Sequence, residues 1–173
     1  MRLSLRAGHA PEEVLTRLQL ARGERVLAAA EATAVWLLGT RLALYVVAPH
    51  EVQRIGWEQV EHAGWDAEAD LLVVAEVGEW GHPRPVHRFG LAEQQERPGR
   101  LLDLLRERVS ASVLLQRRVP IGENGLGVTL HARRAPGDGR IGWFVTYDDG
   151  LDPDVVRPQV EAALAAARTD VEP

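Results

Sequence analysis

The chain has 173 residues, of which 46% are apolar and 26% charged, a balance typical of a globular protein with one core of ordinary size. It contains no cysteine, which excludes disulfide bonds, thiolate metal sites and cysteine nucleophiles. All 20 of its Lys and Arg residues are arginine, so a Schiff-base lysine and a P-loop lysine are excluded as well. The formal net charge is −5, and residues 84–140 are basic between two acidic ends. We expect these segments to pair with one another on the folded surface rather than to mark an anionic partner.

No segment of the sequence is predicted to enter a membrane. Residues 1–6 lack the apolar stretch that a secretory signal needs. The most apolar window, residues 35–48, is about 14 residues long and is interrupted by Arg41, whereas a helix that crosses a bilayer needs roughly 20 residues. We therefore expect no transmembrane segment and a cytoplasmic location.

The first predicted element is a short helix that begins at Pro11 and is stopped by Gly23. Proline fits the first helical position, and the two glutamates behind it favour the positive end of the helix dipole. Val14, Leu15 and Leu18 share one face of this helix. We expect that face to pack on the sheet that follows.

Short apolar segments separated by turn residues then predict seven strands, at a spacing of roughly 8–12 residues that is typical of a small barrel or sandwich. Gly39-Thr40 is interpreted either as a tight turn or as a bulge within one long strand. Trp36, Trp57 and Trp65 fall in these strands and are assigned to the core. The predicted strands cover residues 24–32, 34–38, 41–47, 52–57, 59–65, 71–77 and 85–91.

A long helix is predicted from Pro98 to Val119, ending near Arg118 because Pro120 cannot donate the next backbone hydrogen bond. Its apolar side chains recur at helical spacing and form a continuous stripe that must cover the open end of the preceding barrel. The stripe consists of Leu102, Leu105, Val109, Ser112 and Val113.

The last segment, residues 120–173, is predicted to form a β-hairpin and a helix that dock on the main domain. Its strands cover residues 125–134 and 140–147, and Pro136-Gly137-Asp138-Gly139 between them is typical of a hairpin turn. The helix begins at either Asp152-Pro153 or Arg157-Pro158. The predicted organisation is therefore an N-terminal helix at 1–22, a main domain at 23–119 and a C-terminal unit at 120–173.

Four parts of the chain together resemble the bacterial pleckstrin-homology-like (PH-like) domains over residues 20–119. They are Gly23–Leu27, Trp36–Tyr45, Ile55–Val60 and the long helix. The resemblance implies an α+β fold in which seven strands form two nearly orthogonal antiparallel sheets, capped by the helix. The whole chain, including Arg133-Arg134 and Tyr147–Pro153, also resembles a family of uncharacterised proteins from high-GC Gram-positive bacteria.

The PH-like fold is shared by lipid binders, peptide binders and scaffolds, so it does not define one activity. Relatives that bind phosphoinositides use basic residues in the first hairpin loop. The corresponding residues 28–34 contain Glu31 and no arginine. Phosphoinositide binding is therefore not expected.

The candidate binding residues lie in a loop and at the ends of predicted elements. Trp80 is the strongest of them, because the predicted loop at residues 79–83 would expose its indole, and exposed tryptophans often mark contact surfaces. Basic side chains at element ends offer an anion patch, with Trp143 or Phe144 as a stacking platform for nucleic acid, although no RNA-recognition signature supports that use. The candidate binding set is Trp80, His82, Arg117, Arg118, Arg133 and Arg134.

Neither a metal nor a cofactor is expected. His82, His87, Glu76 and Glu79 have the right atoms for a divalent metal, but a Gly- and Pro-rich loop between two strands is polar for ordinary reasons, and this explanation is preferred. The acidic cluster at residues 148–154 lacks the spacing of a calcium loop.

Two functions remain open at this point. The preferred one is a non-catalytic protein-interaction or scaffold module that binds a protein partner or a second copy of itself. The alternative is a small-ligand-binding protein or enzyme whose site lies between the barrel and the C-terminal unit, with His87, His131 or Glu76 as acid or base. The scattered positions of the histidines disfavour this alternative.

Overall fold

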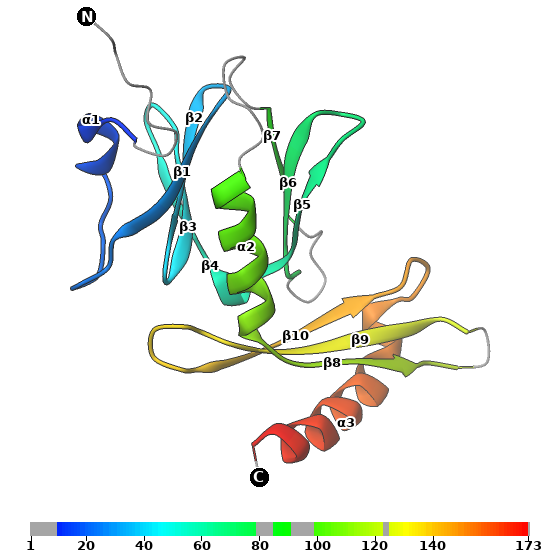
Figure 1. The fold of residues 1–173 in the computed structure, drawn as a ribbon. Coiled ribbons are helices and arrows are strands. Elements are labelled where there is room, and N and C mark those ends of the chain that lie inside the picture. Colours follow the sequence, from blue (N-terminus) through cyan, green and yellow to red (C-terminus); the bar gives the residue numbers. More distant parts are fainter. Residues whose placement is uncertain (1–9, 79–84, 91–98, 123–124, 173) are drawn as a thin grey trace, which may run out of the picture.

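The computed structural model describes residues 10–78, 85–90, 99–122 and 125–172 (Figure 1). These residues form an α+β fold with ten strands in three antiparallel sheets, which confirms the predicted fold class. The helices are α1 (Glu12–Leu15), the 3-10 helix η1 (Trp57–Gln59), α2 (Gly99–Ser112) and α3 (Pro153–Val171). The strands are β1 (Val26–Ala32), β2 (Val35–Thr40), β3 (Ala43–Val47), β4 (Val52–Gly56), β5 (Val60–Asp66), β6 (Leu71–Glu76), β7 (Val86–Gly90), β8 (Val113–Pro120), β9 (Gly127–Arg134) and β10 (Ile141–Tyr147).

The first seven strands are those predicted, and their ends shift by only one or two residues. They form two separate sheets, with strand orders β1-β2-β3-β4 and β5-β6-β7, in place of one clear seven-stranded barrel. The 3-10 helix η1 separates β4 from β5 and redirects the chain from one sheet to the other. A hydrogen bond from the Thr33 backbone N–H to the Gly90 carbonyl (2.8 Å) links the tip of the β1–β2 hairpin to the end of β7.

The turn between β2 and β3 falls on Arg41-Leu42, not on Gly39-Thr40, which are the last residues of β2. The Thr40 hydroxyl accepts hydrogen bonds from the backbone N–H groups of Leu42 (3.0 Å) and Ala43 (3.1 Å). Serine and threonine hydroxyls commonly stabilise tight turns in this way. The same hydroxyl lies 2.5 Å from Oε1 of Glu24, to which it donates, so a buried polar contact ties the turn to the start of β1.

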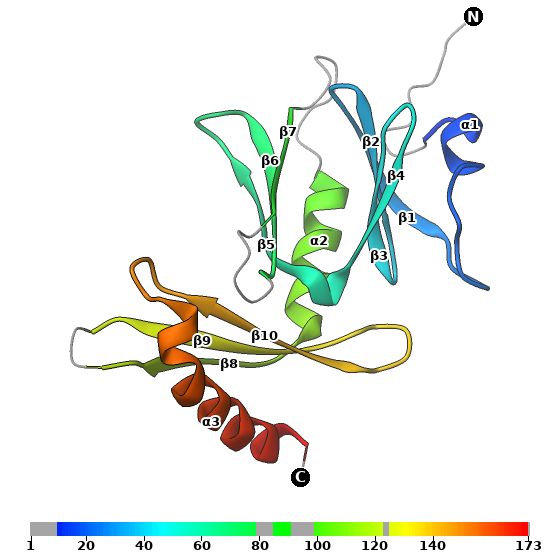
Figure 2. The same cartoon turned by 180° about the vertical axis from the view of Figure 1, so that it is seen from behind.

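Helix α2 lies between the first two sheets, as Figures 1 and 2 both show. Its four leucines at positions 101, 102, 104 and 105 are buried against Leu37 and Leu72 from the two sheets and against Trp57 from η1. The expected apolar stripe is therefore confirmed over this part of the helix. Helix α2 packs closely on β2 at Gly39, where an added Cβ would stand 2.6 Å from Cδ2 of Leu104.

The predicted end of this helix is wrong. It ends at Ser112, and residues 113–120 continue directly as strand β8, which pairs with β9. Val113, which was assigned to the apolar stripe, is 37% exposed. The strand is favoured because Leu115 and Val119 then pack on the core of the C-terminal sheet, and alternate residues of a strand share a face.

The C-terminal unit is consequently larger than a hairpin and a helix. Its sheet has the order β10-β9-β8, and α3 covers one face of it (Figure 2). Val128 and Leu130 of β9 are fully buried there, together with Val160 of α3. The helix begins at Pro153, with Oδ1 of Asp152 accepting from the Asp154 N–H (2.9 Å), so the first of the two predicted starts is the correct one.

Side chains of the C-terminal sheet and its hairpin join it to the first part of the chain. The Arg133 side chain is only 2% exposed and donates to Oγ of Ser112 (3.1 Å) and to the carbonyl of Glu61 (3.2 Å). At the tip of the β9–β10 hairpin, Gly137 lies against the buried side chain of Leu42.

The N-terminal helix is a single turn, much shorter than the predicted helix that runs to Gly23. Pro11 is its N-cap residue rather than its first helical residue. Glu24 fixes the path of the chain between this helix and β1. Its Oε2 accepts from the Ala21 N–H (2.8 Å), and its Oε1 accepts from the Thr40 hydroxyl. Val14 still packs as expected, on the face of the first sheet that points away from α2 (Figure 1).

In the described ranges, no helix combines the length and the apolar character needed to pass through a bilayer.

The contact at Gly39 predicts a cost for any larger residue. Gly39→Ala should lower the free energy of unfolding by about 1–3 kcal/mol, because Leu104 must move away from the added methyl group. Gly99→Ala at the start of α2 is the control: an added Cβ meets nothing within 4 Å there, and we expect a change of less than about 0.5 kcal/mol. Urea unfolding measures both. Equal values for the two variants would contradict the close packing of α2 on β2.

Candidate functional site

Of the six residues predicted to bind a partner, Trp80 and His82 lie outside the described residues. The four arginines are described, and they do not form one patch. Arg117 and Arg118 are consecutive residues of β8, and Arg133 and Arg134 are consecutive residues of β9, so each pair divides between opposite faces of the sheet.

Three of these arginines are occupied by contacts within the chain. Arg117 pairs with Asp170 of α3 (2.9 Å), and Arg118 makes a two-pronged contact with Asp148 (3.0 and 2.5 Å). Arg133 is buried, and this burial lowers the pKa of its guanidinium. Arg134 is exposed. Arg117 and Arg118 therefore hold the C-terminal unit together, and Arg133 joins that unit to α2 and β5.

The residues named for acid–base chemistry are divided between two places. Nε2 of His87 lies 2.6 Å from Oε1 of Glu76, and the imidazole is stacked on Phe89 with ring centroids 6.0 Å apart. His131 lies in the third sheet, where Nε2 is 3.2 Å from Oγ1 of Thr146 and 3.8 Å from the Glu61 carboxylate. Among the described residues, no three metal-ligating side chains are grouped as a metal site.

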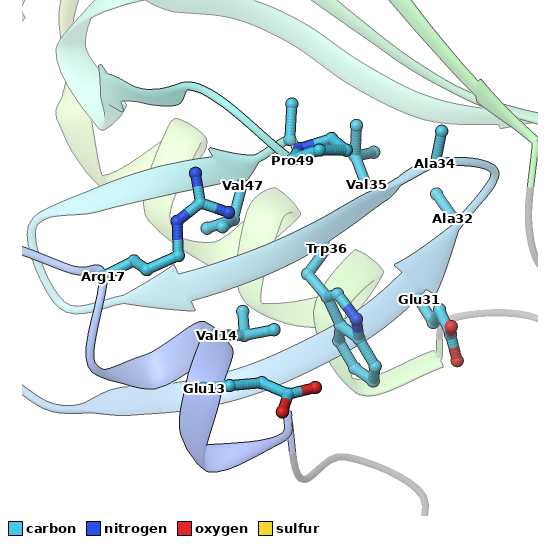
Figure 3. Close-up of a pocket in the computed structure, with 11 residues that line it drawn as sticks. Glu13, Val14, Arg17, Glu31, Ala32, Ala34, Val35, Trp36, Val47 and Pro49 are labelled. Carbon is cyan, nitrogen blue, oxygen red and sulfur yellow. The ribbon is translucent and has the colours of Figure 1, made fainter.

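A concave site lies on the outer face of the first sheet (Figure 3). It is a pocket of about 370 Å³ bounded by α1, the β1–β2 hairpin and the loop after β3. Val14, Val35 and Val47 form part of its apolar lining. The remaining residues around it are Glu13, Arg17, Glu31, Ala32, Ala34, Trp36, Ala48 and Pro49.

Trp36 is the largest side chain of this pocket, and it is only partly buried. It lies opposite Glu31 in the β1–β2 pairing, two positions from the hairpin turn. The turn is tight, with Ala34 at a φ of 63°, a conformation that non-glycine residues seldom adopt. The hydrogen bond from the Thr33 N–H to the Gly90 carbonyl holds this turn against β7. The hairpin that carries the Trp36 indole is therefore anchored at its turn.

The pocket is negatively charged beside the indole and positively charged at its far side. In Figure 3 the ring of Trp36 lies between the carboxylates of Glu13 and Glu31. The Glu13 carboxylate makes no hydrogen bond or ion pair within the part of the chain that the structure describes. Arg17 is engaged elsewhere, because its Nη2 donates to the backbone carbonyl of Glu51 (3.3 Å) and fastens α1 to the β3–β4 loop.

Sequence reasoning assigned Trp36 to the core and so did not identify this pocket. Trp57 is in the core, fully buried in η1, and Trp65 is partly buried against the same cluster. Trp36 is likewise partly buried and packs against the core cluster beneath α1, but its remaining surface lines the pocket because α1 covers only part of the outer sheet face. A signal was available in Glu13, whose charge would be difficult to accommodate if a longer helix covered that face completely.

Comparisons of the chain with protein-family models, with curated proteins and with solved structures found no match.

The Arg118–Asp148 pair gives a prediction about pH. The hydrogen bond from Arg118 holds the pKa of Asp148 below its usual range. A lowered pKa in the folded state means that the stabilisation is present above the unfolded-state pKa, about 3.9, and is lost as the pH falls through the folded-state value. Asp148→Asn should therefore be less stable than the natural chain at pH 7, and this deficit should shrink as the pH is lowered below about 3.9, as measured by urea unfolding.

Asp149→Asn is the matched control, since this neighbouring aspartate is exposed and shows no contact with Arg118. It should change stability little at either pH. An Asp148→Asn deficit that stays the same at pH 3 would show that the carboxylate charge is not what stabilises this turn.

Proposed function

We propose that the protein is a non-catalytic protein-interaction module that binds a partner through the Trp36 pocket. The observation that carries the proposal is the partly exposed indole in an apolar pocket, with the Glu13 carboxylate beside it. Exposed aromatic side chains in concave sites are characteristic of interaction surfaces, where they bury a large area at little entropic cost. The pocket also stands on strands rather than on a long loop, which favours a preformed binding site.

The proposal includes a family and a location. The four-stranded and three-stranded sheets with α2 between them support a divergent PH-like unit, to which β8–β10 and α3 add a second layer. The likeness of the sequence to proteins of high-GC Gram-positive bacteria supports a bacterial origin. The cytoplasmic location expected from the sequence remains part of the proposal.

The partner's contribution is proposed to be a positively charged side chain on an extended segment. A guanidinium or ammonium group over the face of a tryptophan is attracted by the ring, by about 0.5–2 kcal/mol according to its exposure. Glu13 adds an opposite charge at the edge of the same ring, and the valines receive the methylene groups of an arginine or lysine stem. An anionic side chain would meet the Glu13 carboxylate and is disfavoured.

The test uses short peptides of the form acetyl-Gly-X-Gly-amide, with X as arginine, lysine, norleucine or glutamate, and follows the indole N–H signals by NMR. The arginine and lysine peptides should shift the Trp36 signal, the norleucine peptide should shift it less, and the glutamate peptide should leave it unchanged. Trp36→Ala, followed through the backbone amide signals of β1 and β2, should weaken arginine-peptide binding about tenfold or more. Trp65 lies outside the pocket, so Trp65→Phe should leave binding of the arginine peptide unchanged.

Charge is tested separately with two neighbouring glutamates of α1. Glu13 lines the pocket and Glu12 does not, although both are exposed. Glu13→Gln should weaken binding of the arginine peptide several-fold and reduce its salt dependence, and Glu12→Gln should not. Equal effects of the two substitutions, or equal binding of the glutamate peptide, would overturn the proposal.

A further inference from the structure

Each of the three sheets ends in two outer strands, whose outward backbone groups are available for pairing with another chain. Proteins usually protect such edges with charged residues, proline or an irregularity in the strand. Five of the six outer strands in the described sheets carry at least one of these. They are β1 with a register shift and Glu31, β4 with Arg54, β5 with a register shift and Glu61, β7 with Arg88, and β8 with a register shift, Arg117, Arg118 and Pro120.

The sixth outer strand, β10, has none of these protective features. Its seven residues contain no charge and no proline, and its pairing with β9 runs without interruption from Ile141 to Tyr147. Every residue of β10 is partly exposed, whereas the central strand β9 is buried along most of its length. A long, uncharged, regular edge of this kind favours pairing with a further strand.

The hydrogen bonds that flank β10 show which of its backbone groups are free of β9. The Ala135 N–H donates to the Arg140 carbonyl (2.8 Å), and the Asp148 N–H donates to the Gly127 carbonyl (3.0 Å). In an antiparallel pair, hydrogen-bonded positions recur at every second residue. Even-numbered residues of β10 therefore direct their backbone groups to β9, and the odd-numbered ones, Ile141, Trp143, Val145 and Tyr147, direct theirs to the outer edge.

We propose that β10 pairs antiparallel with β10 of a second copy of the chain, so that two C-terminal sheets join as one. A strand without charge meets no repulsion from an identical strand, and an antiparallel pair related by a two-fold axis closes after two copies. The outward backbone groups lie on odd-numbered residues, so the hydrogen-bonded pairs across the axis are odd with odd. With the axis at Phe144, Trp143 lies opposite Val145 of the second copy, and all four outward residues are paired.

Charge complementarity selects this register. With the axis at Phe144, Arg140 at the start of one strand lies opposite Asp148 at the end of the other, and the same pair recurs at the other end. Directly opposite residues of an antiparallel pair share a face, so the two side chains are on the same side of the joined sheet. A shift of the axis by one position removes both pairs. Arg140 and Asp148 also keep their contacts with Asp138 and Arg118 in the single chain.

The first test measures mass in solution by sedimentation over a range of concentrations. We expect the natural chain to form dimers, and Phe144→Lys to weaken dimerisation about tenfold or more, because two like charges then face each other across the axis. Phe144→Glu should behave in the same way, and an equimolar mixture of the two variants should regain the dimer. A natural chain that stays monomeric throughout, or a dimer that Phe144→Lys does not weaken, overturns the proposal.

The second test uses the absence of cysteine from the natural chain. Phe144→Cys should form a disulfide-linked dimer under mild oxidation, since residues that meet at the axis have Cβ atoms about 4.5–5.5 Å apart. Thr129→Cys is the matched control: Thr129 is partly exposed on the same face of the sheet, but it lies on the central strand and cannot reach the second copy. Equal cross-linking of the two variants overturns the proposal. This result is independent of any loss of folding in the charged variants and of peptide binding at Trp36.

Discussion

The close approach of α2 to β2 is the constraint on which the fold depends. Leu104 reaches the space above Gly39 that any side chain would fill, and both of the first two sheets bury their apolar faces on this helix. The next residue, Thr40, has its carbonyl bonded to Nε1 of Trp57 (3.1 Å) and its hydroxyl bonded to Glu24. Helix, turn and the entry into β1 are therefore positioned around two consecutive residues of one strand.

The strands could be predicted because short apolar runs between turn residues are a local pattern. The end of α2 could not, because Leu115 and Val119 fit a helical stripe as well as a strand face. The choice between them is made by β9 and α3, which lie later in the chain and supply the surface on which these side chains are buried. The short N-terminal helix has a similar explanation, since Glu24 bonds to Thr40, a residue that no local pattern associates with it.

The candidate pocket was beyond local patterns for a related reason. Trp36 lies in an apolar strand, and its exposure follows from how little of the sheet α1 covers. The arginines were predicted to bind a partner because they are basic residues at element ends. Their acidic partners Asp148 and Asp170 come from the last part of the chain, so the sequence alone did not show that Arg117 and Arg118 were already engaged.

Helix α2 passes into β8 without an intervening loop, Ser112 being the last helical residue and Val113 the first of the strand. Arg133 braces this junction by bonding to Ser112 and to the backbone of β5. The C-terminal sheet is therefore attached to the main core at this junction in two ways, by the chain itself and by a buried guanidinium, which together fix where β9 lies relative to α2 and β5.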